Sequence, residues 1–154
     1  MPNHIIFMRE ALKEAEAALA EDEVPVGAVV VRENKIIARG HNQIERLKDP
    51  TAHAEMLALT AACGSLRTKW LSGVSLYVTI EPCSMCSGAL VLARIRNLYF
   101  GAADPKTGAC GSALNIINNK KLNHRVKVRG LILEKECGSL LSEFFKKKRS
   151  KERA

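Results

Sequence analysis

Apolar side chains recur at helical spacing over the first twenty residues of the chain. Every third or fourth position there is apolar, with Glu and Lys among the residues between, which predicts an amphipathic helix over residues 4–20. Pro25 ends this pattern, because the residue before a proline disfavours the helical conformation. The run 26–31 that follows is apolar throughout, which is typical of a strand covered on both faces.

The rest of the chain alternates between strand and helix patterns. Glu33 and Asn34 are typical of a turn and predict a hairpin whose second strand covers 35–39. A polar loop follows this second strand. Much later in the chain, one helical turn is expected near 114–117. The remaining strands are expected at 74–80, 98–100 and 126–133, and the remaining helices at 52–62, 82–93 and 137–149. Strands that alternate with helices predict an α/β domain, with one central sheet and helices packed on its faces.

Length and composition narrow the class of protein. The 154 residues favour a single domain over 1–154 rather than two. Hydrophobic residues make up 47% and charged residues 26%, which argues against disorder. No apolar run approaches the roughly 18 residues of a membrane span, and residues 1–4 show no secretory signal. Since five cysteines without an export signal fit a reducing compartment, we expect a cytoplasmic protein and no membrane.

The positive charge gathers in two segments of the C-terminal third. The formal net charge is +8, and residues 120–129 and 146–153 each contribute +5, so the remainder of the chain sums to −2. Such clustering is the pattern expected for a polyanionic partner. For the C-terminal segment alone, a solvated charged helix face is the slightly better interpretation.

Two short segments carry the candidate chemistry, and each lies at the predicted start of a helix. They are Thr51-Ala52-His53-Ala54-Glu55 and Glu81-Pro82-Cys83-Ser84-Met85-Cys86. Cys83 and Cys86 are three residues apart and point the same way on a helix, and the start of a helix stabilises thiolates. Two thiolates and the imidazole of His53 suit zinc and leave a fourth position for water, whose pKa the metal lowers. Glu55 could then take a proton from that water.

Neither of the two motifs alone is strong evidence for a catalytic zinc site. A Cys-x-x-Cys pair could be a redox pair, half of a structural zinc site or two buried thiols. A structural zinc site normally closes with four protein ligands, and no other histidine has ligand-like spacing to the pair. His-x-Glu followed by Pro-Cys-x-x-Cys is instead the signature of zinc deaminases that act on nucleobases, adenosine deaminases of tRNA among them.

Beyond the two motifs, the chain resembles the bacterial tRNA-specific adenosine deaminases of the cytidine deaminase-like superfamily. The resemblance covers nearly the whole chain and includes Glu23–Ala28, His41-Asn42, Pro50–Glu55, Leu76–Thr79, Glu81–Cys86, Asp104–Gly108, Leu122–Arg125 and Phe144-Phe145. It implies a three-layer fold with a central five-stranded mixed sheet and helices on both faces. It also implies one CMP/dCMP-type deaminase domain with a basic C-terminal helix and tail over about 137–154. The implied activity converts adenosine at the wobble position (34) of a tRNA anticodon to inosine.

The resemblance also implies the roles of individual residues and the state of assembly. His53, Cys83 and Cys86 would hold one Zn²⁺ per subunit, and Glu55 would shuttle the proton. The residues implied in substrate binding are Pro25 and Val26 in the base pocket, Asn42 on the nucleoside, the backbone amide of Ala54 on the base edge, and Asp104, Lys106, Asn123, Phe145 and Arg149 on the splayed nucleotides of a tRNA anticodon stem-loop. A homodimer is implied, in which the neighbouring subunit completes each groove.

Other interpretations remain open for several of these residues. On spacing alone, Asn123 is as typical of a turn as of an RNA contact. Phe144 and Phe145 are adjacent on a helix and point about 100° apart, so we expect one to be buried and the other to lie near the groove. Two other functions compete with the leading one: a deaminase of a free base such as guanine or cytosine, and a non-catalytic RNA-binding subunit with structural zinc. A non-catalytic subunit would not need the carboxylate of Glu55.

Overall fold

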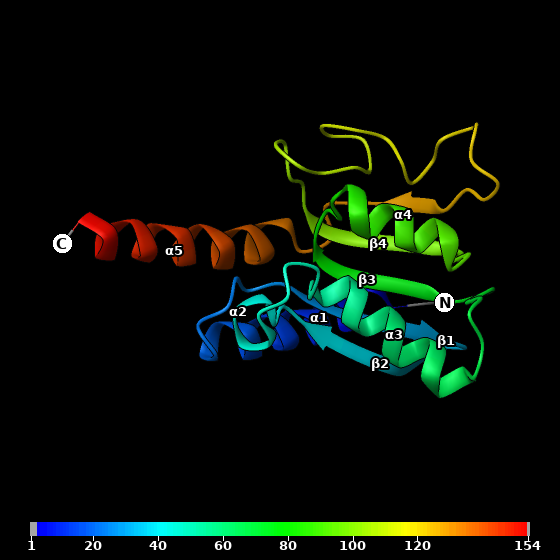
Figure 1. Cartoon of the computed structure of the whole chain (residues 1–154), viewed down its shortest axis with the longest axis horizontal. Helices are drawn as coiled ribbons and strands as arrows, with labels where there is room; N and C mark the ends of the chain where they lie inside the picture. Colours follow the sequence, from blue (N-terminus) through cyan, green and yellow to red (C-terminus); the bar gives the residue numbers. More distant parts are fainter. Residues whose placement is uncertain (1–2, 154) are drawn as a thin grey trace.

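The computed structural model describes residues 3–153, which form ten helices and strands. In chain order they are α1 (His4–Ala20), β1 (Gly27–Arg32), β2 (Lys35–His41), α2 (Ile44–Leu47), α3 (Ala54–Leu66), β3 (Ser75–Ile80), α4 (Ser84–Leu92), β4 (Asn97–Ala102), β5 (Lys127–Arg129) and α5 (Glu134–Arg153) (Figure 1). No helix in this range is both long and apolar enough to cross a bilayer.

The five strands form one mixed sheet in the order β2-β1-β3-β4-β5. Strand β1 runs antiparallel to both β2 and β3, whereas β3, β4 and β5 run parallel to one another. The predicted five-stranded mixed sheet is therefore confirmed. Because β3 and β4 are parallel, the segments that follow them leave the same edge of the sheet, and the candidate motif 81–86 begins there.

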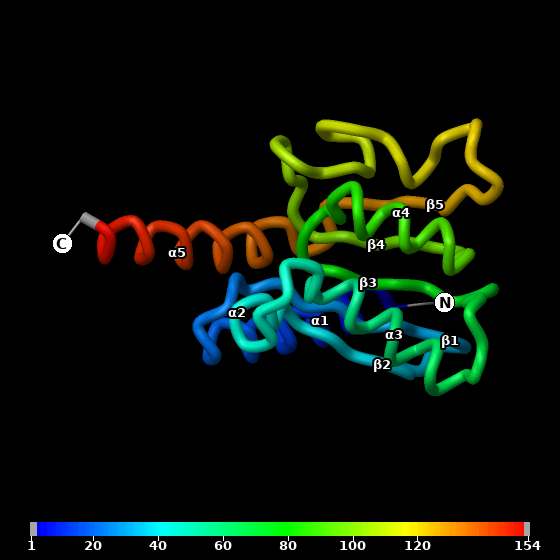
Figure 2. Tube along the Cα trace, in the orientation of Figure 1, coloured from blue at the N-terminus to red at the C-terminus, as the bar shows by residue number. Residues whose placement is uncertain are grey.

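Helices cover both faces of the sheet, which confirms the predicted three layers. Figure 1 shows α3 and α4 in front of the sheet and α1 behind it. One buried cluster joins α3 and α4 to the inward side chains of β1, β3 and β4, and a second joins α1 to the opposite face. Helix α5 begins beside β4 and then extends past the sheet, as the red end of the trace in Figure 2 shows.

Small residues allow two helices to approach the sheet closely. A Cβ added at Gly40 on β2 would lie 2.6 Å from the carbonyl oxygen of Ala54 on α3. Gly27 on β1 meets the backbone of α1 in the same way, and Ala11 and Ala15 are fully buried at that contact. The contact at Gly40 positions the start of α3, where His53 lies.

The hairpin turn and most helices agree with the sequence pattern. Glu33 and Asn34 have φ values of 50° and 65°, which fits a turn of the type that favours two residues in the left-handed region. Helix α3 starts at Ala54, two residues later than expected, because His53 is extended at its N-cap. Helix α5 starts three residues earlier than expected and continues to Arg153.

Three expectations about local structure are wrong. The polar loop after β2 contains the short helix α2. The segment 114–117 forms no helical turn and instead joins an isolated bridge between Cys110 and Asn115. The strand expected over 126–133 is only Lys127–Arg129, because the chain turns after it through the left-handed region at Leu131 and Leu133.

Candidate active site

Two helix starts converge at the edge of the sheet where β3 ends. His53 is the N-cap of α3, and Cys83 is the N-cap of α4, which follows β3 directly. Neither side chain caps its own helix, so both remain available to bind elsewhere. Cys86 lies in the first turn of α4 and is fully buried.

The three donor atoms have the spacing of ligands to a single zinc ion. His53 Nδ1 lies 3.7 Å from Cys83 Sγ and 3.5 Å from Cys86 Sγ. With Zn–S and Zn–N bonds of ordinary length, a tetrahedral site places N and S about 3.6 Å apart. Among the described residues this group contains only these three side chains. Its chemistry therefore fits a zinc site with three protein ligands and one open position.

The electrostatics of the group favour a charged sulfur beside a charged imidazole. Hydrogen bonds from Cys86 and then from His53 lower the pKa of Cys83 to about 4. The same contact with Cys83 raises the pKa of His53. The contact with Cys83, together with burial, raises the pKa of Cys86.

Glu55 is the second residue of α3, two positions after His53, and lines the same space as His53 and Cys83. Only 3% of its surface is exposed. Burial is the main cause that raises the pKa of its carboxyl group, because an apolar environment disfavours the charged form. A carboxyl group with raised proton affinity, next to an open metal position, is suited to take up a proton and release it again.

A small cavity opens over this group. Its volume is about 240 Å³, below the range of pockets for drug-sized ligands and of the right order for a single base. The side chains around it come from six segments of the chain; they are Val24, Val26, Asn42, Ile44, His53, Glu55, Ile80, Glu81, Cys83, Asp104, Thr107, Leu141 and Phe145. A larger hollow of about 520 Å³ adjoins it, shares Asp104 and Phe145, and adds Lys106 and Arg149.

Of the two adjacent phenylalanines, one is buried and the other is exposed near the cavity, as expected. Phe144 is 6% exposed and buried, whereas Phe145 is 43% exposed and lines both hollows. Of the residues predicted to bind substrate, Val26, Asn42, Asp104 and Phe145 thus meet at the first cavity, with Lys106 and Arg149 beside it.

Three predicted contacts differ from this picture. Pro25 is buried and is not among the side chains that line the cavity. Asn123 lines a separate hollow with Trp70 and Leu92, beyond the opposite end of the sheet. The backbone N–H of Ala54, expected on the base edge, donates instead to Asn42 Oδ1 at 2.8 Å. The cavity wall therefore includes Val26, Asn42, Asp104 and Phe145 but neither Pro25 nor Asn123.

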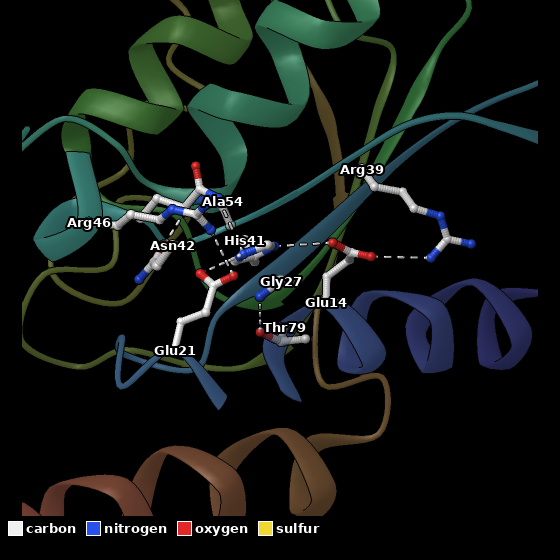
Figure 3. A network of polar contacts seen from close by, with 10 residues as sticks. Glu14, Glu21, Gly27, Arg39, His41, Asn42, Arg46, Ala54 and Thr79 are labelled. Atoms are coloured by element: carbon white, nitrogen blue, oxygen red, sulfur yellow. Dashed lines mark hydrogen bonds and ion pairs between the residues drawn. The ribbon is translucent and has the colours of Figure 1, made fainter. Parts of the chain in front are cut away.

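A polar network fixes the end of β2 that carries Asn42. His41 lies between two carboxylates, with Nδ1 3.3 Å from Glu14 on α1 and Nε2 3.2 Å from Glu21 (Figure 3). Glu21 also accepts from Arg46 on α2 at 3.2 Å. The network joins α1, β2 and α2 around Asn42, whose amide oxygen is held by the start of α3.

Two buried carboxylates position the loops around the cavity, and sequence reasoning assigned them no role. Glu23 accepts the backbone N–H groups of Glu45 and Arg46 at 3.0 and 2.8 Å, at the start of α2. Glu81 accepts backbone N–H groups of Asp104, Cys110 and Ser112 at 3.0, 3.0 and 3.1 Å, as well as the Ser112 hydroxyl. Glu81 directly follows an apolar run and precedes Pro82, and Glu23 lies two residues before Pro25, ahead of another apolar run. These positions are the one signal that could have suggested burial.

A mixed five-stranded sheet that brings one imidazole, two thiols and a buried glutamate together at two helix starts defines a nucleobase deaminase domain. The profile of the MafB19-like deaminase family matches residues 2–149, and the chain belongs to this family. It is 56% identical over 144 residues to a tRNA-specific adenosine deaminase of Aquifex aeolicus, covering 94% of this chain and 95% of that protein. It is 48% identical to that of Bacillus subtilis, covering 97% and 92%.

The solved structures that resemble this chain are also deaminases. A structure from work on A-to-I editing by tRNA:A34 deaminases has a TM-score of 0.85 and 44% identity, covering 88% of this chain and 98% of that one. A guanine deaminase from Nitrosomonas europaea has a TM-score of 0.80 and 26% identity, covering 94% and 85%. The fold is thus shared by deaminases of RNA and of free bases.

Proposed function

We propose that this chain converts adenosine to inosine by hydrolysis at the wobble position (34) of a tRNA anticodon. The observation that carries the proposal is the three-donor group at zinc spacing, with Glu55 buried beside it in a cavity of base size. The relatives named tRNA-specific adenosine deaminase, matched over nearly their whole length, support the substrate.

His53, Cys83 and Cys86 hold one Zn²⁺ in this proposal. When bound, the ion supplies Lewis-acid activation of water and lowers its pKa toward neutrality. Glu55 takes a proton from the attacking water as oxygen bonds to C6 of adenine. It delivers this proton to the ring nitrogen N1. It then carries the second proton from the new C6 hydroxyl to the amine, and the C–N bond breaks to release ammonia and leave the C6 carbonyl of inosine. Water and adenosine are consumed, and inosine and ammonia are formed.

The cavity wall holds the base and the hollow beside it holds the neighbouring nucleotides. Val26 packs on the base, backed by Pro25, and Asn42 uses the N–H groups of its amide, because its oxygen accepts from Ala54. For Ala54 to bond the base edge, Asn42 must give up that contact. Exposed Phe145 offers a face on which a splayed base can stack. Asp104, Lys106 and Arg149 contact the adjoining nucleotides.

The remaining assignments concern the whole chain. Residues 1–154 form one deaminase domain, and α5 with its tail supplies a basic arm. The chain acts in the cytoplasm on tRNA and assembles as a homodimer. An apolar side chain that is 78% exposed, Leu92 at the end of α4, supports an interface between subunits. Sedimentation should show a dimer that Leu92→Glu weakens.

The experiment that tests the function is sequencing of tRNA after incubation with the protein. Adenosine 34 should be read as guanosine after treatment with the wild-type chain and remain adenosine with Glu55→Gln, which should still bind zinc and RNA. A deaminase of free guanine or cytosine, favoured by the shared fold with guanine deaminases, would release ammonia from the base and leave the tRNA unchanged. A non-catalytic RNA-binding subunit would bind the tRNA and change neither substrate.

A further inference from the structure

His41 ends β2, and its side chain lies on the face of the sheet that α1 covers (Figure 3). Asn42, the next residue, lines the cavity and bonds to the start of α3 on the other face, because successive residues of an extended chain point to opposite faces. Gly27 on β1 is the pairing partner of His41, and a Cβ added to Gly27 would lie 2.7 Å from the Cβ of Glu14. The absence of a side chain at Gly27 therefore lets α1 bring Glu14 beside the ring of His41.

Both nitrogens of the His41 ring face carboxylate oxygens. Nδ1 lies 3.3 Å from Oε1 of Glu14, and Nε2 lies 3.2 Å from Oε2 of Glu21. A carboxylate only accepts hydrogen bonds, and a neutral imidazole carries a single N–H. Both contacts are therefore satisfied together only by the imidazolium, which carries an N–H on each nitrogen.

Two arginines extend these contacts to neighbouring elements. Glu14 also pairs through Oε2 with Arg39 on β2, at 3.5 Å. Glu21 also pairs through Oε1 with Arg46 on α2, at 3.2 Å. Each carboxylate thus bridges the ring of His41 to one arginine. Because the first residue of α2 lines the cavity, the charged ring connects α1 to two parts of the cavity wall.

The loss of one proton from His41 changes these contacts. The side-chain amide nitrogen of Gln43 lies 3.4 Å from Nε2 of His41. Without its proton, Nε2 is an acceptor, so it can take an N–H from Gln43 but can no longer donate to Glu21. The contact of the ring with Glu21, and through it with Arg46 on α2, is then lost, while Nδ1 can still donate to Glu14.

We propose that His41 is a positioning residue for binding of the target nucleoside, and that its doubly protonated ring holds Asn42 and α2 in place. This inference rests on the proposed function, in which the cavity wall that contains Asn42 holds the base. The ring of His41 is not among the side chains that line the cavity, so it acts through its neighbours. The loss of its charge should therefore weaken substrate binding and leave the chemical step unchanged.

The test measures KM and kcat for adenosine deamination in tRNA between about pH 5.5 and 8.5, a range in which histidine loses its proton. The zinc-loaded wild type is compared with His41→Gln at constant ionic strength. The matched control is His4→Gln at the start of α1. His4 Nδ1 lies 2.7 Å from the hydroxyl of Tyr77, and burial, followed by the charge of Arg129, lowers the pKa of His4 below 6.5. The ring of His4 is therefore mostly uncharged above that pH.

The KM of His41→Gln should exceed that of the wild type by about 2- to 10-fold at the acidic end of the range, since partly exposed ion pairs are individually weak. The two KM values should converge at the alkaline end, where the wild-type ring is neutral, and kcat should be the same for both chains throughout. For His4→Gln, the ratio of KM to that of the wild type should not change with pH above 6.5. A ratio for His41→Gln that is independent of pH would overturn the inference, as would a change in kcat alone or the same pH dependence in the control.

A measurement without substrate separates this inference from the proposed function. In an NMR titration of the zinc-loaded protein, the backbone amides of Asn42 and Arg46 should shift with the same midpoint as the ring of His41. This response should be absent from His41→Gln, and amides that do not follow the ring would overturn the inference. A wild type that deaminates no adenosine 34 would instead contradict the proposed function, and the titration would still decide whether His41 positions Asn42 and α2.

Discussion

Glu81 offers a quantitative test of how the site is positioned, through the variant Glu81→Gln. The carboxylate Oε2 accepts from the backbone of Cys110 and Ser112, whereas Oε1 accepts from the backbone of Asp104 and from the Ser112 hydroxyl. The best orientation of glutamine places its nitrogen at the Oε1 position, since the hydroxyl can then reverse and accept. The backbone N–H of Asp104 then loses its partner.

The expected loss follows from these bonds. An unpaired buried donor costs about 1–3 kcal/mol, and two bonds to Oε2 lose the strengthening due to charge, so the total is about 2–4 kcal/mol. For a domain of this size each kcal/mol lowers Tm by about 2–4 °C, so Tm should fall by about 4–16 °C. The loop that carries Asp104 and Thr107 should also loosen, and KM for the RNA should rise more than kcat falls.

The pH dependence of the free energy of unfolding tests whether the charged carboxylate of Glu81 is the stabilising group. Burial alone would raise the pKa of Glu81, but hydrogen bonds from Ser112 and the backbone lower it below 4.5. The folded chain therefore binds this proton less readily than the unfolded chain. The stabilisation is complete above pH 4.5 and disappears as pH falls through the folded value. The difference in free energy of unfolding between wild type and Glu81→Gln should shrink over that range.

Urea denaturation at several pH values measures this difference, with Glu16→Gln on the exposed side of α1 as the control. The control should differ little from the wild type at any pH. A Glu81→Gln chain that is within 1 kcal/mol of the wild type at neutral pH, or whose deficit persists unchanged in acid, would refute the reasoning.

Two further predictions concern the start of α3. Gly40→Ala should destabilise the chain by about 1–3 kcal/mol, since the new Cβ collides with Ala54, and it should lower zinc affinity by displacing His53; an unchanged melting curve and zinc affinity would contradict this. Asn42→Ala leaves the Ala54 N–H without its partner and should cost about 1–3 kcal/mol and raise KM. If Asn42→Ala melts like the wild type and keeps its KM, the assigned hydrogen bond has no role.

Local patterns in the sequence account for most elements of the fold. The hairpin turn at Glu33 and Asn34 and the amphipathic stripe of α1 depend on neighbours in sequence, so periodicity was sufficient. Strand β5 is shorter than the sequence predicts because Leu131 and Leu133 adopt positive φ. A leucine in the sequence gives no indication of that conformation. The sequence did not predict the short helix α2 after β2, because the carboxylate that caps this helix, Glu23, lies about twenty residues earlier.

The candidate site, like the fold, could be predicted only where residues close together in the sequence determine it. The chemistry of His53, Glu55, Cys83 and Cys86 could be inferred because residue type and spacing at helix starts are local properties. The role of Glu81 could not, since its partners lie 23–31 residues away in a segment without regular structure. Nor could the position of Asn123, because the parallel arrangement of β3, β4 and β5 determines at which edge its loop lies.

X-ray absorption at the zinc edge tests the central claim most directly. On the purified protein, the account predicts two sulfur neighbours at about 2.3 Å and two nitrogen or oxygen neighbours at about 2.0–2.1 Å, with the scattering signature of a single imidazole. Cys83→Ser should lose one sulfur or the metal altogether, and Glu55→Gln should leave the spectrum almost unchanged. A site with two imidazoles or a third sulfur would be closed to water and would contradict the account.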